Sequence, residues 1–185
     1  MNPKRAVAVS KFLSKHLRHA PGDLGLALEP GGWVPVADLL EASEAKNFPI
    51  ALDELEAVVE GSDKQRFAFD STGTRIRANQ GHSVEVDLQL APAPPPAVLY
   101  HGTPEANVAM ILASGLAKMR RHHVHLSVDV ATATKVGGRR GKPVTLAVDA
   151  AAMARDGFAF FVSANGVWLA DEVPAQYLHV ADPPR

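Results

Sequence analysis

The stretch that decides the fold of the N-terminal half is Arg66-Phe67-Ala68-Phe69-Asp70-Ser71-Thr72-Gly73-Thr74-Arg75-Ile76-Arg77-Ala78. Apolar and polar residues alternate on both sides of a turn that contains glycine, and this pattern predicts a β-hairpin. Upstream, apolar residues at helical spacing predict helices over residues 5–19, 33–43 and 52–60. Three helices followed by a hairpin is the order of a winged-helix domain, which we expect over residues 1–91.

A proline-rich segment, residues 92–96, follows the hairpin region. Proline removes backbone donors and stiffens the chain, so we interpret this segment as a linker. Beyond it, short predicted strands and helices alternate, and Asn165-Gly166 between two apolar runs is a strong hairpin signal. We therefore predict a second domain over residues 98–185 and an α+β fold class for the chain.

Composition excludes several kinds of protein. Of the 185 residues, 46% are apolar and 21% are charged, as in ordinary globular proteins. Because cysteine is absent, disulfides, thiolate zinc sites and cysteine nucleophiles are excluded. No apolar run approaches the roughly 18 residues of a membrane span, and the charged N-terminal stretch does not have the pattern of a signal peptide. We expect a cytoplasmic monomer that makes no contact with a membrane.

The charge distribution is uneven. A formal net charge of −1 argues against a polybasic coat for nucleic acid. Residues 118–142, however, contain seven lysines and arginines against the single acid Asp129. This local excess is suited to an anion, although a solvated basic face is the alternative.

A predicted strand over residues 121–127 carries an unusual polar face. A period of two places Arg121, His123, His125 and Ser127 on one side, while the apolar residues between them face a core. A guanidinium, two imidazoles and a hydroxyl in a row favour a ligand that bears phosphate. A metal bound by the two histidines is the alternative, but no thiolate or third ligand accompanies them, so we predict no metal site.

Two further groups of polar residues lie where a predicted strand or helix ends. His101 stands at a strand end before Gly102, where glycine allows a ligand to approach, although a half-buried histidine in a turn is equally consistent. Arg18 and His19 fall at the C-terminal tip of the first predicted helix, where a surface pair near the last carbonyls is the alternative.

Taken together, these segments resemble the RNA 2′-phosphotransferase family. The resemblance runs in order along nearly the whole chain. The matching stretches are residues 10–14 with 17–21, 32–33, 63–67, 76–83, 99–103, 115–116 with Met119, Arg121 and 123–127, 141–144, and 165–169.

The resemblance implies an N-terminal winged helix and a C-terminal ADP-ribosyltransferase lobe that binds NAD. It implies two reaction steps and no metal. First, an internal 2′-phosphate of RNA, as left in spliced tRNA, attacks the ribose C1″ of NAD and expels nicotinamide. Second, the ribose O2″ attacks that phosphate, which frees the RNA 2′-OH and gives ADP-ribose 1″,2″-cyclic phosphate.

The resemblance also implies roles for individual residues. The catalytic set that handles the phosphate is Arg18, His19, Arg66 and Arg121, with His19 as a proton donor or acceptor or as a phosphate ligand. Residues implied to contact NAD are His101, Gly102, Thr103, His125, Ser127, Asn165 and Val167, and Arg77 and Asn79 are implied to hold RNA or phosphate. The triad His101, His125 and Val167 lacks the glutamate of many ADP-ribosyltransferases, which suits an acceptor that is itself an anion.

Two other functions stay open on the sequence. One is an NAD-dependent ADP-ribosyltransferase whose final product is the ADP-ribosylated nucleic-acid phosphate. The other is a non-enzymatic winged-helix regulator. The regulator requires a basic recognition helix, whereas the helix predicted over residues 52–60 is acidic.

Overall fold

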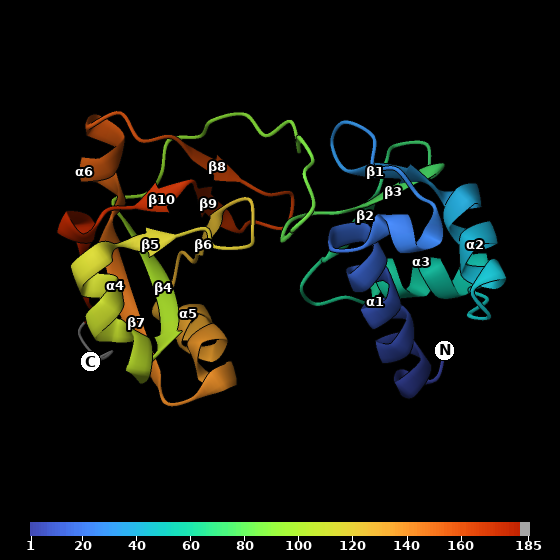
Figure 1. Ribbon diagram of the computed structural model, residues 1–185, viewed down its shortest axis with the longest axis horizontal. Coiled ribbons are helices and arrows are strands. Elements are labelled where there is room, and N and C mark those ends of the chain that lie inside the picture. The colour runs from blue at the N-terminus through green and yellow to red at the C-terminus, as the bar shows by residue number, and fades with distance from the viewer. Residues whose placement is uncertain (182–185) are drawn as a thin grey trace. The chain divides into compact units, whose positions relative to one another are not determined.

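The computed structural model describes residues 1–181, apart from the side chain of Arg140. The chain forms two compact units, Met1–Leu90 and the part that begins at Ala91 (Figure 1). Each unit has a hydrophobic core of its own. Both contain helices and strands, so the predicted α+β class is confirmed. Within residues 1–181, no helix combines the length and the apolar character that a membrane crossing requires.

Three α-helices surround the core of the first unit, and they are α1 (Pro3–Arg18), α2 (Val36–Ala45) and α3 (Leu52–Glu60), with a 3-10 turn at Pro21–Leu24. The start of α1 is tied to α3 because the Arg5 Nε and Nη2 atoms each donate to a Glu54 carboxylate oxygen at 2.8 Å. These hydrogen bonds lower the pKa of Glu54 to about 2. The other end of α1 finishes at Arg18, with His19 as its C-cap.

The sheet of the first unit has the order β1-β3-β2, formed by Trp33–Pro35, Arg75–Ala78 and Phe67–Phe69. All pairs are antiparallel, and the predicted hairpin of β2 and β3 is confirmed. The prediction that Trp33 begins a helix is wrong, because Trp33 pairs with Arg77 in the sheet. Proline disfavours helical backbone in the residue before it, so Pro35 delays the helix until Val36.

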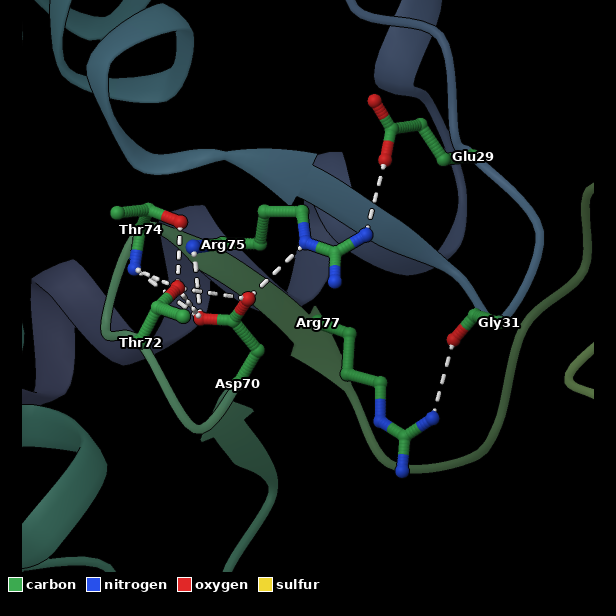
Figure 2. A network of polar contacts seen from close by, with 7 residues as sticks. All are labelled: Glu29, Gly31, Asp70, Thr72, Thr74, Arg75 and Arg77. Carbon is green, nitrogen blue, oxygen red and sulfur yellow. Dashed lines mark hydrogen bonds and ion pairs between the residues drawn. The ribbon is translucent and has the colours of Figure 1, made fainter.

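The hairpin turn is organised by the carboxylate of Asp70 (Figure 2). Its Oδ1 accepts hydrogen bonds from the backbone N–H groups of Thr74 at 3.1 Å and Arg75 at 3.2 Å. Its Oδ2 accepts from Arg75 Nε at 3.0 Å. Burial raises the pKa of Asp70, but the hydrogen bonds from Arg75 and Thr72 outweigh it and bring the pKa to about 2.

The second unit consists of short strands and helices around its own core. Its sheets have the orders β11-β7-β4, β6-β9-β8 and β10-β5. The strands are β4 (Val98–Pro104), β5 (Leu116–Ala117), β6 (Val124–Leu126), β7 (Pro143–Asp149), β8 (Phe160–Val162), β9 (Trp168–Ala170), β10 (Glu172–Val173) and β11 (Leu178–Val180). The helices are α4 (Val108–Ser114), α5 (Val130–Gly137) and α6 (Ala150–Arg155), and the hairpin predicted at Asn165-Gly166 joins β8 to β9.

Helix α5 lies directly on β4, with backbone against backbone. A Cβ atom on Gly102 would lie 1.7 Å from the Ala133 carbonyl oxygen. On the helix side, a Cβ atom on Gly137 would lie 2.7 Å from the Thr103 nitrogen. Two glycines therefore allow this contact, which any larger residue would prevent.

The proline-rich segment does not begin as a free linker. Pro92 forms an antiparallel bridge with Phe161, and the Ala93 N–H donates to the Phe160 carbonyl at 2.8 Å. The first residues of this segment therefore extend the edge of β8 and are part of the second unit, contrary to our interpretation of the whole segment as a linker.

Candidate functional site

In the first unit, Arg18 lies against the segment that enters β2. Its Nη2 atom donates to the Arg66 carbonyl at 3.4 Å, and its Cζ atom lies 5.6 Å from the centre of the Phe67 ring. Arg18 is the last residue of α1 and is half-buried. The two arginines predicted to hold the phosphate on this unit are thus neighbours.

His19 is fixed by a residue that the sequence analysis did not assign. Its Nδ1 atom lies 2.9 Å from the Ser83 Oγ atom, and the Ser83 N–H donates to the Arg18 carbonyl at 2.9 Å. Ser83 ends the polar stretch 76–83, which was the signal available in the sequence. This contact holds the His19 ring through its Nδ1 atom.

Asn79 forms two hydrogen bonds with the loop that precedes β2. Its side chain is 5% exposed, and its Nδ2 atom donates to the Gln65 carbonyl at 2.6 Å. Its backbone N–H donates to the Arg66 carbonyl at 2.9 Å. Gln65 has a φ of +40°, which is uncommon for a residue with a side chain. Asn79 thereby brings Arg66 beside Arg18 and His19.

In the second unit, His101 has a defined tautomer. Its Nδ1 atom lies 3.0 Å from the His125 carbonyl oxygen, which can only accept, so Nδ1 carries the proton. Burial lowers the pKa of His101, more than the hydrogen bond to His125 raises it. At neutral pH the ring is therefore neutral, and its Nε2 atom presents a lone pair to an N–H or O–H of a ligand.

Arg121 and His125 are in direct contact. The Arg121 Nη1 atom lies 3.1 Å from the His125 Nδ1 atom. A guanidinium has no lone pair to offer, so Nδ1 accepts and the His125 ring carries its proton on Nε2. His101 and His125 are therefore opposite tautomers, with the proton on Nδ1 of His101 and on Nε2 of His125.

The strand predicted over residues 121–127 is shorter than expected. Only Val124–Leu126 form β6, with Val124 and Leu126 buried as predicted. Residues 119–120 form a turn and residues 121–123 a bend, so Arg121 contacts His125 across this bend instead of along a strand face. Beyond β6, Ser127 exchanges two backbone hydrogen bonds of 2.8 Å with Tyr100, which joins this edge to β4 beside His101.

Gly102 and Thr103 have packing roles of their own. Glycine at position 102 is required by α5, as described above. Thr103 is 3% exposed. Their contact with NAD stays a prediction that rests on the resemblance.

Asn165 and Val167 are linked through a serine that the sequence analysis did not single out. Ser163 is 2% exposed, and its Oγ atom lies 2.7 Å from Asn165 Oδ1 and accepts from the Val167 N–H at 3.1 Å. Because the hydroxyl donates to Oδ1, the amide nitrogen of Asn165 is turned away from Ser163. The register that pairs Leu126 with Trp168 continues toward Ser127 and Val167, so this turn lies at the same end of the sheet as Ser127.

The remaining histidine of the polar face has a different environment. The ring of His123 lies 5.6 Å from that of Phe161, and burial lowers its pKa. Within residues 1–181 no three histidine, aspartate or glutamate side chains gather as a metal site would require.

Burial of His101 predicts a pH dependence of stability in the second unit. Between its lowered pKa and the ordinary value of 6.5, the unfolded chain binds more protons than the folded chain. Stability is therefore complete above pH 6.5 and is lost as the pH falls through the lowered pKa. In a Trp33→Phe background, whose fluorescence comes from Trp168, we expect the urea midpoint to fall as the pH is lowered from 7.5 to 5, and to fall less when His101→Asn is added.

The control for this prediction is His179→Asn, since His179 is exposed on β11. That variant should keep the wild-type pH dependence. A His101→Asn protein with an unchanged pH dependence would show that His101 does not titrate as its burial requires.

Comparison with known proteins shows which family the chain belongs to. Residues 4–172 match the family described as "RNA 2'-phosphotransferase, Tpt1 / KptA family". A protein of Trichormus variabilis named "Probable RNA 2'-phosphotransferase" is 61% identical over 180 residues, covering 97% of this chain and 99% of the relative. One of Streptomyces coelicolor with the same name is 55% identical over 183 residues, covering 99% of this chain and 100% of the relative. The chain therefore belongs to the RNA 2′-phosphotransferase, or Tpt1/KptA, family.

Proposed function

We propose that this protein transfers an internal 2′-phosphate of RNA to NAD and releases 2′-OH RNA, nicotinamide and ADP-ribose 1″,2″-cyclic phosphate. The proposal rests on membership of the family and on one observation above all, the linked set His101, His125 and Arg121. This set combines directional donors and acceptors for NAD with a guanidinium suited to phosphate. We propose a cytoplasmic monomer that acts on spliced tRNA.

We further propose that the first unit is a winged helix and that the second unit is an ADP-ribosyltransferase-like lobe. Three helices with a three-stranded antiparallel sheet support the first assignment. The short antiparallel sheets of the second unit, with His101 and His125 on adjoining strands, support the second. In this proposal NAD is bound by the second unit through His101, Gly102, Thr103, His125, Ser127, Asn165 and Val167.

In the first step the protein positions two reactants. The 2′-phosphate is already an anion, so its attack on C1″ needs no base. We propose that the lone pair on His101 Nε2 and the proton on His125 Nε2 orient the NAD ribose and amide groups. Orientation of two reactants of this kind is worth several kcal/mol of the barrier.

In the second step negative charge develops on the phosphate oxygens. We propose that Arg18, Arg66 and Arg121 bind these oxygens, because guanidinium forks match phosphate and stay charged at any working pH. As the O2″–P bond forms and the P–O2′ bond breaks, His19 gives a proton to the departing RNA O2′, and the attacking O2″ hydroxyl loses its proton to solvent, which returns one to His19. The hydrogen bond between Ser83 and His19 supports this role because it holds the ring in one orientation.

The proposal is tested by incubating the protein with NAD and an oligonucleotide that carries one internal 2′-phosphate. We expect nicotinamide and 2′-OH oligonucleotide to form in equal amounts, with no conversion when NAD is omitted. Stable accumulation of ADP-ribosylated oligonucleotide would instead support the alternative ADP-ribosyltransferase. Removal of the 2′-phosphate without NAD would contradict both.

A further inference from the structure

The turn that precedes β6 exposes a methionine. Residues 118–121 lie between β5 and β6 (Figure 1), and the Arg121 N–H closes the turn by donating to the Lys118 carbonyl at 3.0 Å. Met119 is 85% exposed, against 61% for Met110 on α4. The side chain of Met119 therefore adds almost nothing to the packing of the second unit.

The backbone of this turn has a conformation that suits glycine. φ is +55° at Met119, the second of the four residues, and is not positive at Arg120. A positive φ at the second residue alone is the pattern of a type II′ turn, in which glycine is preferred at that position. A residue with a Cβ atom is strained there. Methionine at position 119 thus strains the backbone without improving the packing, which indicates a role in contact with a ligand.

The same turn is positively charged. Within residues 1–181, Lys118 Nζ lies 3.5 Å from a carboxylate oxygen of Asp171, and no ion pair involves Arg120 or Arg121. The charge of the two arginines favours a polyanion. Single-stranded RNA combines anionic phosphates with bases whose faces are apolar, so it matches an exposed apolar side chain among cations.

Met119 lies two residues before Arg121, which we propose binds the reacting phosphate. The Arg121 Nη1 atom lies 3.1 Å from His125 Nδ1, so this guanidinium is next to the proposed NAD-binding residues. Two residues span at most about 7 Å of chain. In a nucleotide with a 2′-phosphate, the phosphate and the base are attached to adjacent carbons of the ribose. A phosphate bound by Arg121 therefore brings its own base within reach of Met119.

We infer that Met119 packs against the base of the nucleotide that carries the 2′-phosphate. The inference rests on the proposed function and extends it, because it assigns recognition of the nucleoside to a residue outside the predicted catalytic and NAD-binding sets. The contact joins a thioether to an aromatic ring, which all four bases provide. It therefore strengthens the binding of RNA without selecting one base.

The experiment measures equilibrium binding without NAD. The ligands are a pentanucleotide with one internal 2′-phosphate and the same strand with hydrogen in place of the base on the 2′-phosphorylated nucleotide. The proteins are wild type, Met119→Ala and the matched control Met110→Ala, which removes the same side chain from an exposed position of α4. We expect Met119→Ala to weaken binding of the complete strand about fivefold, as for loss of one sulfur–aromatic contact. Its affinity for the strand without the base should equal that of wild type, and Met110→Ala should change neither affinity.

Two further variants separate the side chain from the backbone. Met119→Leu keeps an apolar side chain of similar size and should retain most of the affinity for the complete strand. Met119→Gly removes the strain of the positive φ, so its urea midpoint, followed by circular dichroism, should not fall below that of wild type. Its affinity for the complete strand should nevertheless be as low as that of Met119→Ala. Lost affinity with full stability would show that the methionine serves the ligand.

Two results would overturn the inference. One is unchanged binding of the complete strand by Met119→Ala, and weaker binding of NAD by that variant would then place Met119 on the dinucleotide. The other is an equal loss for both strands, which would place Met119 on the sugar or the phosphates. Because NAD is absent from the strand-binding measurements, a protein that binds both strands as expected but transfers no phosphate would contradict the proposed function alone.

Discussion

Arg121→Ala is expected to lower the rate of 2′-phosphate transfer about 100-fold or more, with little effect on folding. Arg121 is exposed, and its hydrogen bond to His125 contributes little stability at the surface. Removal of a group that stabilises charge in a transition state typically lowers kcat by about 100- to 1000-fold. In single turnover we expect the variant to release nicotinamide and stall at the ADP-ribosylated RNA, or to lose both steps.

The matched control is Arg120→Ala, which removes an exposed arginine of the same turn. We expect this variant to keep nearly the wild-type rate. A normal rate in Arg121→Ala would remove Arg121 from the site, and an equal loss in both variants would attribute the effect to the general charge of the turn.

Gly102→Ala is expected to destabilise the second unit by about 3 kcal/mol or more. The added methyl group would lie 1.7 Å from the Ala133 carbonyl oxygen, so α5 must move away from β4. Overpacking of a core commonly costs about 1–3 kcal/mol, and a clash with backbone has no flexible side chain to absorb it. Urea unfolding followed by Trp168 fluorescence in the Trp33→Phe background should show the loss.

The control is Gly138→Ala at the end of α5, where the nearest atom to a new Cβ would be 3.7 Å away. This variant should unfold at nearly the wild-type midpoint. If Gly102→Ala were as stable as wild type and merely bound NAD more weakly, the glycine would be needed for the ligand and not for packing.

Local patterns were sufficient to predict most helices and both hairpins. The alternation in residues 66–78 and the Asn165-Gly166 turn encode their own geometry, because the interacting residues are close in sequence. Trp33 was assigned to a helix because its partner, Arg77, lies 44 positions later in the chain. Strands of two residues, such as β5 and β10, are too short to show any period.

The sequence identified candidate site residues by their type, but it did not show which of them are in contact. Arg121 and His125 were expected to share a strand face, and they meet instead across a bend. Ser83 was missed because its partner His19 is 64 residues away in the chain. Gly102 was predicted to let a ligand approach the backbone. Its packing against α5 was missed, because a sequence does not show which helix will pack on a strand.

The most direct test of the central claim follows the 2′-phosphate itself. An oligonucleotide with a radiolabelled internal 2′-phosphate is incubated with the protein and NAD, and the labelled products are separated. The proposed reaction predicts that the label leaves the RNA in ADP-ribose 1″,2″-cyclic phosphate. Label recovered as inorganic phosphate would contradict transfer to NAD.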